Sequence, residues 1–303
     1  MIIGKNVIGS VSIILSLIFM SSCQKEIVDP VKKYSFFVAG HTYGQPGVDN
    51  VGLHPPFQQK FEFLNNRNAS LGFLTGDIVK ECTEKNWNEV DSVLAFLDAD
   101  VYLVAGNHDV SDRELFEARY GRTYYYFKKY DDLFIILDPN FDHWNISGLQ
   151  LEFLQKILSE ENQVRNIFVF FHQILWWSEN NKYRNVRINS KEGRADTINF
   201  WSEIIPLFNK LDNPVSMFAG DMGAVSWSDN YMYDTIQNIT FIASGMGDED
   251  DDNIVIVNVS IEGIIDYDLI AINGDDINAL GELEDYILPT KYPVSIGKIF
   301  QGD

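Results

Sequence analysis

The sequence VYLVAGNHDV, residues 101–110, joins an apolar run of five residues to the polar cluster Gly106-Asn107-His108-Asp109. A short apolar run of this kind predicts a strand that is buried on both faces. The polar cluster begins where the strand ends, and in α/β proteins ligands bind beyond the carboxyl ends of the strands. These ten residues therefore predict a buried strand that carries reactive side chains to one edge of a sheet.

The same arrangement of an apolar run followed by a polar or glycine-containing ending occurs five times. The other four runs are residues 34–39, 71–75, 166–171 and 215–219. A further strand is expected at 133–137, and a hairpin over 254–272 that turns at Glu262-Gly263. Segments with helical spacing lie between the strands, at 87–97, 111–121, 147–158 and 197–211. The alternation of strand and helix predicts an α/β architecture.

Two of the expected helices begin with the spacing of a capping box. Ser111 is followed three residues later by Glu114, and Ser147 is followed in the same way by Gln150. In a capping box the hydroxyl accepts a hydrogen bond from the third residue of the helix, whose own side chain bonds back. We therefore expect Ser111 and Ser147 to cap these helices.

Composition limits the size and the partners of the protein. The 303 residues are 46% hydrophobic, which is enough for one large domain, and we place that domain at 34–273. The formal net charge is −21. Nucleic acid is excluded as an expected partner, because its phosphates are bound through clustered Lys and Arg. Residues 274–303 form a C-terminal extension, and the sequence leaves open whether they pack on the domain.

Residues 1–22 have the features of an export signal, with Lys5 ahead of a short apolar segment. The following Met20-Ser21-Ser22-Cys23 resembles a bacterial lipobox, which implies cleavage before Cys23 and lipidation of its sulfur. Residues 23–33 would then be a tether, and the protein would be anchored to a bacterial membrane, periplasmic or at the cell surface. Plain signal cleavage and a retained anchor remain the alternatives. Without Cys23, Cys82 has no partner for an intramolecular disulfide.

The five strand ends together carry a set of side chains suited to a metal. They deliver His41, Asp77, the Asn107-His108-Asp109 trio, His172 and Asp221. One polar residue after one strand would be ordinary loop composition. Five in succession, including three of the five histidines of the chain, predict a site for a divalent ion such as Mn, Fe or Zn.

The motifs Gly76-Asp77, Gly106-Asn107-His108-Asp109 and the His172 after Phe170-Phe171 resemble three of the five motifs of the calcineurin-like metallophosphoesterase family. The resemblance implies an α/β fold in which a two-sheet sandwich is flanked by helices, with a two-metal site at the strand ends. It implies that Asp77 bridges both metals and that Asn107 and His172 bind the second one. His108 would be the catalytic imidazole, and Asp109 would orient it by accepting its second N–H.

The first and fifth motifs depart from the family pattern. His41-Thr42-Tyr43 stands where the family has Asp-x-His, and Gly220-Asp221-Met222-Gly223 stands where it has Gly-His-x-His. The two exchanges look reciprocal, because those strand ends meet at one site in the family fold. One metal would keep Asp77, Asn107, His172 and Asp221, whereas the other would keep only His41 and the shared Asp77. Tyr43 would be a poor ligand unless its phenol lost the proton.

Two functions from different classes follow. The first is a metal-dependent hydrolase of a phosphate mono- or diester outside the cytoplasm, which the presence of His108 favours. The second is a catalytically silent lipoprotein that binds a ligand or partner in envelope or polysaccharide assembly. A weaker third hypothesis is esterase or sulfatase-like hydrolysis on the same scaffold.

Several other residues invite functional interpretation. His54 and His143 are expected to be surface loop histidines, and the acidic run at 248–252 a solvated loop. Trp176-Trp177 could stack a sugar or base, although core packing explains most aromatic side chains.

Overall fold

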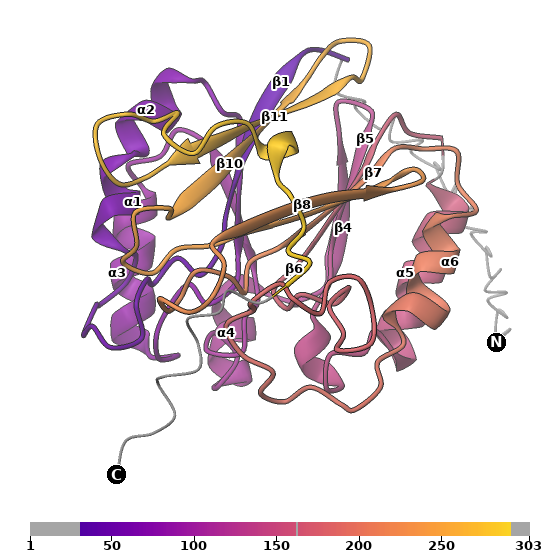
Figure 1. Cartoon of the computed structure of the whole chain (residues 1–303), viewed down its shortest axis with the longest axis horizontal. Coiled ribbons are helices and arrows are strands. Elements are labelled where there is room, and N and C mark those ends of the chain that lie inside the picture. The colour runs from indigo at the N-terminus through magenta and orange to yellow at the C-terminus, as the bar shows by residue number, and fades with distance from the viewer. Residues whose placement is uncertain (1–30, 162, 292–303) are drawn as a thin grey trace, which may run out of the picture.

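The computed structural model describes residues 31–161 and 163–291. The expected export signal, the lipidation site Cys23, most of the tether and the end of the C-terminal extension lie outside these residues. The described chain forms two sheets that face each other and are flanked by helices (Figure 1). No helix among the described residues is both long and apolar enough to cross a bilayer.

The first sheet carries the strands nearest the N-terminus and the final hairpin. Its order is β11-β10-β1-β2-β3, with β1, β2 and β3 parallel and the β10–β11 hairpin antiparallel to β1. The strands are β1 (Tyr34–Ala39), β2 (Leu71–Thr75), β3 (Asp100–Val104), β10 (Asn253–Val259) and β11 (Ile265–Ala271). The carboxyl ends of β1, β2 and β3 therefore open at the same edge.

The second sheet has the order β4-β5-β6-β7-β9-β8, with four parallel strands inside and an antiparallel strand at each edge. The strands are β4 (Tyr125–Lys129), β5 (Asp132–Ile136), β6 (Ile167–Phe171), β7 (Val215–Ala219), β8 (Tyr231–Ile236) and β9 (Ile239–Ser244). The carboxyl ends of β6 and β7 carry the last two sequence motifs.

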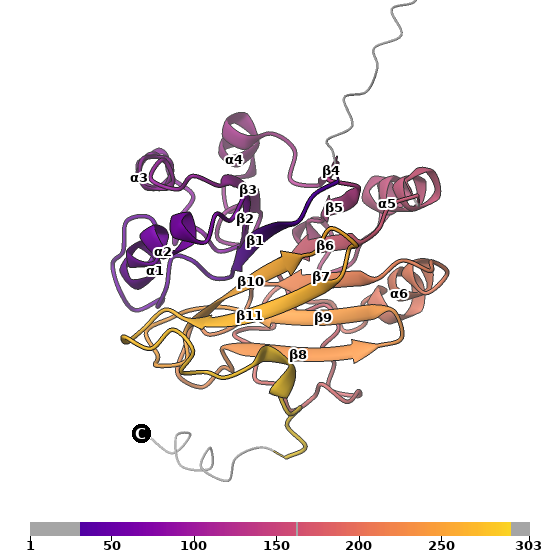
Figure 2. The ribbon, with the colours of Figure 1, turned by 90° about the horizontal axis from the view of Figure 1, so that it is seen from above.

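Helices cover the outer face of each sheet (Figure 2). The first sheet is covered by α1 (Pro55–Gln59), α2 (Phe61–Asn66), α3 (Glu84–Leu94) and α4 (Arg113–Tyr120). The second is covered by α5 (Gly148–Glu160) and by a π-helical turn, Phe200–Ile204, that continues as α6 (Ile205–Phe208). The architecture is therefore helix, sheet, sheet, helix, and it confirms the predicted sandwich.

Strict alternation of side chains along the buried strands builds three separate cores. In β6, Phe168 and Phe170 point between the sheets, whereas Ile167, Val169 and Phe171 point toward the helices. Successive strand residues face opposite sides, so a strand between two apolar layers shows no polar alternation. Between the sheets, Phe170 stacks on Phe73 with ring centroids 3.9 Å apart. The aromatic seam between the sheets fixes the distance between the two sets of strand ends.

Every strand predicted from the sequence is present, with its start or end displaced by no more than one residue. The expected burial of β3 on both faces is wrong, because β3 lies at the edge of its sheet and residues 101–103 are only half-buried. Three strands were not predicted, β4, β8 and β9. The last two form a hairpin whose turn residues are Gln237, with φ of 56°, and Asn238. This turn lacks the Asn-Gly or Asp-Gly signal that marks a two-residue hairpin in a sequence.

Both predicted capping boxes are wrong in their details. The side chain of Asp112, not Ser111, caps α4 by accepting a hydrogen bond from the Leu115 N–H at 3.0 Å. Ser147 does precede α5, but its hydroxyl donates to Asp142 instead of capping the helix. At α4 the physical reason is that a carboxylate is a stronger acceptor for a backbone N–H than a hydroxyl, and the Ser111 hydroxyl donates to the His108 carbonyl at 2.8 Å. At α5 the Ser147 hydroxyl is oriented by its bond to the Asp142 carboxylate.

The described part of the C-terminal extension packs on the domain. Leu283, in the 3₁₀ turn Leu283–Asp285, is fully buried against the aromatic seam between the sheets. Tyr286 and Leu288 pack against the core that lies between the second sheet and its helices. Residues 283–288 therefore contribute to the same folded unit as residues 34–273.

Candidate functional site

The loops after β1 and β2 hold two side chains in an unusual backbone conformation. His41 has φ of 51° and Asp77 has φ of 50°, both in the left-handed region that disfavours residues with a side chain. The two loops are joined by hydrogen bonds from His41 N–H to the Gly76 carbonyl and from Tyr43 N–H to the Asp77 carbonyl, each 3.1 Å. Such strain costs about 1–3 kcal/mol per residue and persists where the surroundings enforce it, most often at functional sites.

Four buried side chains from both sheets meet in a continuous series. His41 Nε2 lies 3.5 Å from Asp77 Oδ2, and the same oxygen lies 3.3 Å from His172 Nε2. His172 Nε2 in turn lies 4.0 Å from Asp221 Oδ1. The structure therefore brings together His41, Asp77, His172 and Asp221, and the two exchanged motif positions do share one site.

Two glycines make this close approach possible. A Cβ at Gly76 would stand 2.4 Å from the His172 ring, and a Cβ at Gly106 would stand 2.3 Å from Asp77 Oδ1. Contacts below about 3 Å are not tolerated between non-bonded heavy atoms of these types. The glycine in Gly-Asp and in Gly-Asn-His-Asp is thus required by the packing of the site.

The electrostatics of the series call for a positive charge at its centre. The Thr75 carbonyl, 2.9 Å from His172 Nδ1, can only accept, so Nδ1 carries the proton and Nε2 faces two carboxylates. Nε2 is buried and has no hydrogen-bond partner in the part of the chain that the structure describes. Burial lowers the pKa of His172, but Asp77 and then Asp221 raise it to about 10. A lone pair facing two carboxylates is stable only with a proton or a metal ion between them.

The donor set fits a borderline divalent ion, although the donors meet in pairs. Among residues 31–161 and 163–291, no three His, Cys, Asp or Glu side chains already surround one metal position. Binding an ion would require the His172 pairs with Asp77 and Asp221 to open around it. Imidazole and carboxylate donors suit Mn, Fe or Zn, so Asp77, His172 and Asp221 are the residues best placed to hold one.

His41 and Tyr43 lie at the far end of the series. Burial lowers the pKa of His41 to about 4, which leaves a neutral imidazole whose Nδ1 has no partner in the structure. The ring centroids of Tyr43 and His41 lie 4.4 Å apart. Burial, and to a lesser extent the charge of Asp77, raises the pKa of the Tyr43 phenol well above its usual range. These surroundings favour the protonated phenol of Tyr43, which is a poor metal ligand.

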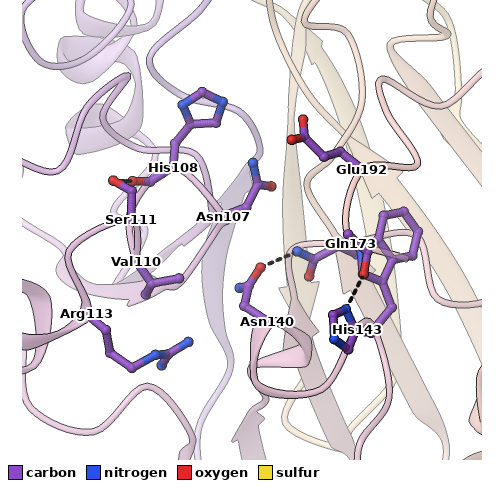
Figure 3. A pocket seen from close by; sticks show the side chains of 11 residues that line it. Asn107, His108, Val110, Ser111, Arg113, Asn140, His143, Gln173 and Glu192 are labelled. Atoms are coloured by element: carbon purple, nitrogen blue, oxygen red, sulfur yellow. Dashed lines mark hydrogen bonds between the residues drawn. The ribbon is translucent and has the colours of Figure 1, made fainter. Parts of the chain in front are cut away.

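Asn107 and His108 lie above the buried series at its exposed side. The His108 N–H donates to Asp77 Oδ1 at 3.1 Å, and the His108 ring nitrogen Nδ1 lies 2.7 Å from the Lys80 carbonyl. Asn107 is exposed, and both side chains line an adjacent cavity (Figure 3). The structure thus separates the predicted residues into a buried set and a solvent-facing set.

The predicted role of Asp109 is wrong. Its carboxylate accepts three backbone hydrogen bonds, from Ile78 and Val79 at 2.8 and 3.0 Å and from Gly106 at 2.8 Å. The second N–H of His108 is instead taken by Lys80. Since Asp109 is fully buried and satisfied by the backbone, it anchors the loops after β2 and β3 and does not orient the imidazole.

One residue beside the series was missed from the sequence. Asn189 lies next to Asp221, whose pKa is raised by burial to about 6 and lowered in part by the Asn189 side chain. The Asn189 carbonyl oxygen accepts a hydrogen bond from Ala224 N–H at 2.9 Å, which ties the long segment after β6 to the loop after β7. A single Asn in a loop between strands carries no signal that would have revealed this contact.

The cavity next to Asn107 and His108 has a volume of about 570 Å³. Its other walls include His143, which was expected to be an ordinary surface histidine, and Gln173, which directly follows His172. Trp176 and Trp177 are buried in the core of the second sheet, so stacking by this pair is wrong. His54 is buried too, 3.7 Å from Asp252, and is not a surface histidine.

Comparison with known proteins yields one family match. The family model described as calcineurin-like phosphoesterase matches residues 40–245. No curated protein sequence matches the chain.

Two solved structures are similar over most of the chain, at low identity. Sulfate thiohydrolase SoxB from Thermus thermophilus, in complex with glycerol, is 9% identical with a TM-score of 0.41, over 85% of this chain and 59% of SoxB. A single-residue variant of Vps29 from Entamoeba histolytica is 10% identical with a TM-score of 0.34, over 79% of this chain and 99% of Vps29. The chain therefore spans less than two thirds of the SoxB structure.

Proposed function

The chain belongs to the calcineurin-like phosphoesterase family, and from that premise we propose that it is a metal-dependent phosphoric ester hydrolase with His108 as its catalytic imidazole. The observation that carries this proposal is the unpartnered His172 Nε2, which faces Asp77 and Asp221 directly beneath His108. A buried imidazole nitrogen that faces two carboxylates needs a proton or a metal ion between them, and a metal ion held by imidazole and carboxylate ligands is a common arrangement.

The buried residues have separate tasks in this proposal. Asp77, His172 and Asp221 would hold a divalent ion, and Asn107 lines the adjacent cavity. When bound, such an ion polarises a phosphoryl oxygen and lowers the pKa of bound water. The Thr75 carbonyl fixes the tautomer of His172, so its Nε2 is the nitrogen that faces the site. His41 extends the series through Asp77, and its low pKa keeps it free of a competing proton.

His108 is suited to proton transfer at the edge of the site. Its Nδ1 donates to the Lys80 carbonyl, so Nε2 is the nitrogen left to exchange a proton with the leaving oxygen of an ester. The backbone bond from His108 to Asp77 keeps the imidazole next to the buried series. The Lys80 carbonyl thus supplies the orienting contact that the sequence assigned to Asp109.

We also propose that the protein acts outside the cytoplasm, anchored by a lipid on Cys23. The support is the sequence Met20-Ser21-Ser22-Cys23 behind a basic and apolar leader. Mass spectrometry of the membrane-extracted protein tests this, since lipidation predicts a mature N-terminus at Cys23 that carries acyl chains. An unmodified Cys23 in the mature protein would contradict it.

The test of catalysis pairs metal analysis with turnover. The full chain should retain a divalent metal on purification and hydrolyse phenyl phosphate or bis(4-nitrophenyl) phosphate. His108→Ala should keep the metal and lose about 100-fold or more in kcat, the usual contribution of a general acid. Activity that survives this change would remove His108 from the mechanism, and a metal-free protein would sink the proposal as a whole.

A catalytically silent binding protein is the competing function. The observation that favours it is the changed first motif, where His41 stands in place of the usual Asp and is paired with Asp77. This alternative predicts metal binding without turnover of either ester. The same two measurements therefore separate it from the hydrolase.

A further inference from the structure

The cavity beside His108 is a built compartment that neither the family match nor the buried series explains. Its walls come from the segment after β3, the turn around Asn140, the residue after His172 and the loop at 192–193 (Figure 3). His108 and Asn107 stand at one side, so a group bound here would adjoin the position from which His108 exchanges a proton. In a phosphate ester, that group is the leaving alcohol.

The charge of the lining argues against an anionic leaving group. Among the described residues that line the cavity, Arg113 is the only Arg or Lys. Its guanidinium is held by Asp138 at 2.7 Å and by the Thr123 hydroxyl at 3.1 Å, and it lies 3.9 Å from the Phe141 ring. Asp138 is fully buried, so this cation is already neutralised. Glu192 adds an exposed negative charge that would repel a second phosphate.

The lining instead presents hydrogen-bond acceptors. Gln173 is 1% exposed, and its Nε2 donates to Asn140 Oδ1 at 2.6 Å, while its Oε1 has no partner among residues 31–161 and 163–291. His143 Nδ1 lies 3.1 Å from the Gly193 carbonyl, which can only accept, so the neutral ring has its lone pair on Nε2. His143 and Glu192 are exposed, so their acceptors add to the polar lining of the cavity, and Gln173 Oε1 is the buried acceptor in it that has no donor among the described residues. Hydroxyl groups supply such donors without adding charge.

The wall that carries His143 is held rigidly. His143 has φ of 49° and Trp144 has φ of 72°, two consecutive strained residues. They are kept in place by hydrogen bonds from Trp144 N–H to the Pro139 carbonyl at 3.0 Å and from Ala195 N–H to the His143 carbonyl at 3.1 Å. Strain that the surroundings maintain is a sign of a pre-organised binding surface.

We propose that this cavity binds a neutral, hydroxyl-rich leaving group, so that the substrate is the phosphate ester of a sugar or polyol. The inference rests on the proposed hydrolase function and adds the substrate class to it. In the reaction, the ester bond between phosphorus and the leaving oxygen breaks, water supplies the new oxygen on phosphorus, and the leaving oxygen gains a proton. Gln173, His143 and Glu192 hold the hydroxyls of the alcohol during this exchange.

Three substrates that differ in the leaving group test the proposal on the full, metal-loaded chain. Glucose 1-phosphate carries a hydroxylated group, phenyl phosphate an apolar one and pyrophosphate an anionic one. We expect the highest kcat/KM for glucose 1-phosphate. Glu192→Gln and Gln173→Met should each lower that value by about 3–10-fold, the effect of one lost hydrogen bond, and the loss should be smaller for phenyl phosphate, whose leaving group offers these side chains no further hydroxyl.

Two controls keep the test decisive. Glu160→Gln alters an exposed carboxylate on α5, far from the cavity lining, and should change nothing. Because Gln173 is buried and its variant could misfold, Glu192→Gln, at an exposed position, carries the result by itself. A preference for pyrophosphate, or equal losses for all three substrates in Glu192→Gln, would overturn the proposal.

A binding measurement separates this inference from the proposed function. Maltose titrated into the full chain should bind, and Glu192→Gln should weaken it by the same factor. Maltose binding without hydrolysis of any ester would retain the cavity assignment and reject the hydrolase. Hydrolysis of phenyl phosphate, without maltose binding and without a preference for glucose 1-phosphate, would retain the hydrolase and reject the cavity assignment. If the protein neither binds maltose nor hydrolyses any of the esters, both hypotheses are rejected.

Discussion

Asp77 and Asp109 follow neighbouring parallel strands, both are buried, and both belong to family motifs, yet they have opposite surroundings. Asp109 accepts three backbone N–H groups. Asp77 accepts one backbone N–H, from His108, and turns its other oxygen toward two imidazoles. The carboxylate that the backbone saturates is structural, and the one left open to other side chains is available for chemistry.

The same distinction applies on the other side of the molecule. Asp252 is fully buried near His54, which makes it resemble the Asp77 and His172 pair. Its carboxylate, however, accepts hydrogen bonds from Asn230 at 2.7 Å and from the Gly247 N–H at 2.9 Å. A buried His and Asp pair is thus not in itself a site, because what matters is how many acceptor positions remain unfilled.

Asp77→Asn should have the largest effect of any change that tests this comparison. The variant keeps the shape of the side chain and removes the charge facing His41 and His172. We expect loss of the bound metal and a fall in turnover of about 1000-fold, the upper range for removing one stabilising group from an active site. Metal analysis and steady-state kinetics measure this, and a variant that keeps both metal and activity would show that Asp77 is not part of the metal site.

Asp109→Ala should lower stability strongly without a direct effect on metal ligands. It leaves the N–H groups of Ile78, Val79 and Gly106 without their acceptor, at about 1–3 kcal/mol for a buried group. We expect a loss of about 3 kcal/mol or more in the free energy of unfolding, measured with urea. Asp112→Ala, which removes the exposed cap of α4, should cost about 1 kcal/mol. Equal losses in the two variants would contradict the anchoring role of Asp109.

Asp252 should produce an unusual dependence of stability on pH. Burial raises its pKa to about 7, so the folded state holds a proton that the unfolded state releases near its ordinary value of about 4. Its contribution to stability is therefore fully present below about pH 4 and is lost as the pH rises toward 7. Relative to Asp252→Asn, the parent protein should lose about 1 kcal/mol or more over this interval, measured by urea unfolding at several pH values. Asp275→Asn, at an exposed position, should show no such difference, and a flat profile for Asp252 would refute the assignment.

Tyr43→Phe should have the smallest effect. Because the phenol keeps its proton, removing its oxygen should leave the metal content unchanged and alter the free energy of unfolding by about 1 kcal/mol or less. Metal analysis of the two proteins side by side decides the matter. Loss of metal in the phenylalanine variant would make Tyr43 a ligand after all.

The fold could be predicted largely because several of its strands are buried on both faces. Residues 71–75 and 215–219 are mostly apolar both where they face the helices and where they face the other sheet, so each run stands out in the sequence. The strands β4, β8 and β9 lie at or near sheet edges, where polar residues interrupt the pattern. Their existence depends on pairing with neighbours that are distant or joined by an unmarked turn.

The residues of the site could be predicted, but their partners could not. Strand ends locate His41, Asp77, His172 and Asp221, because parallel strands deliver their carboxyl ends to one edge. The hydrogen-bond partner of each side chain depends on loop conformation, which the sequence does not specify. For this reason Asp109 was predicted to accept a hydrogen bond from His108, whereas in the structure the Lys80 carbonyl accepts it. Asn189 and Gln173 reach the site from a segment with no regular structure to predict them.

The positions of the tryptophans in the layered cores determine which part of the molecule intrinsic fluorescence can follow. The aromatic seam between the sheets is built from Phe and Tyr, whereas Trp87 lies under the helices of the first sheet. Trp144, Trp176, Trp177 and the partly buried Trp201 lie on the helical side of the second sheet, and Trp227 is exposed. Intrinsic tryptophan fluorescence should therefore follow the outer layers and be nearly blind to the seam. Loosening of the second helical layer would dominate the emission change even if the two sheets stayed together, so the seam must be followed by another probe.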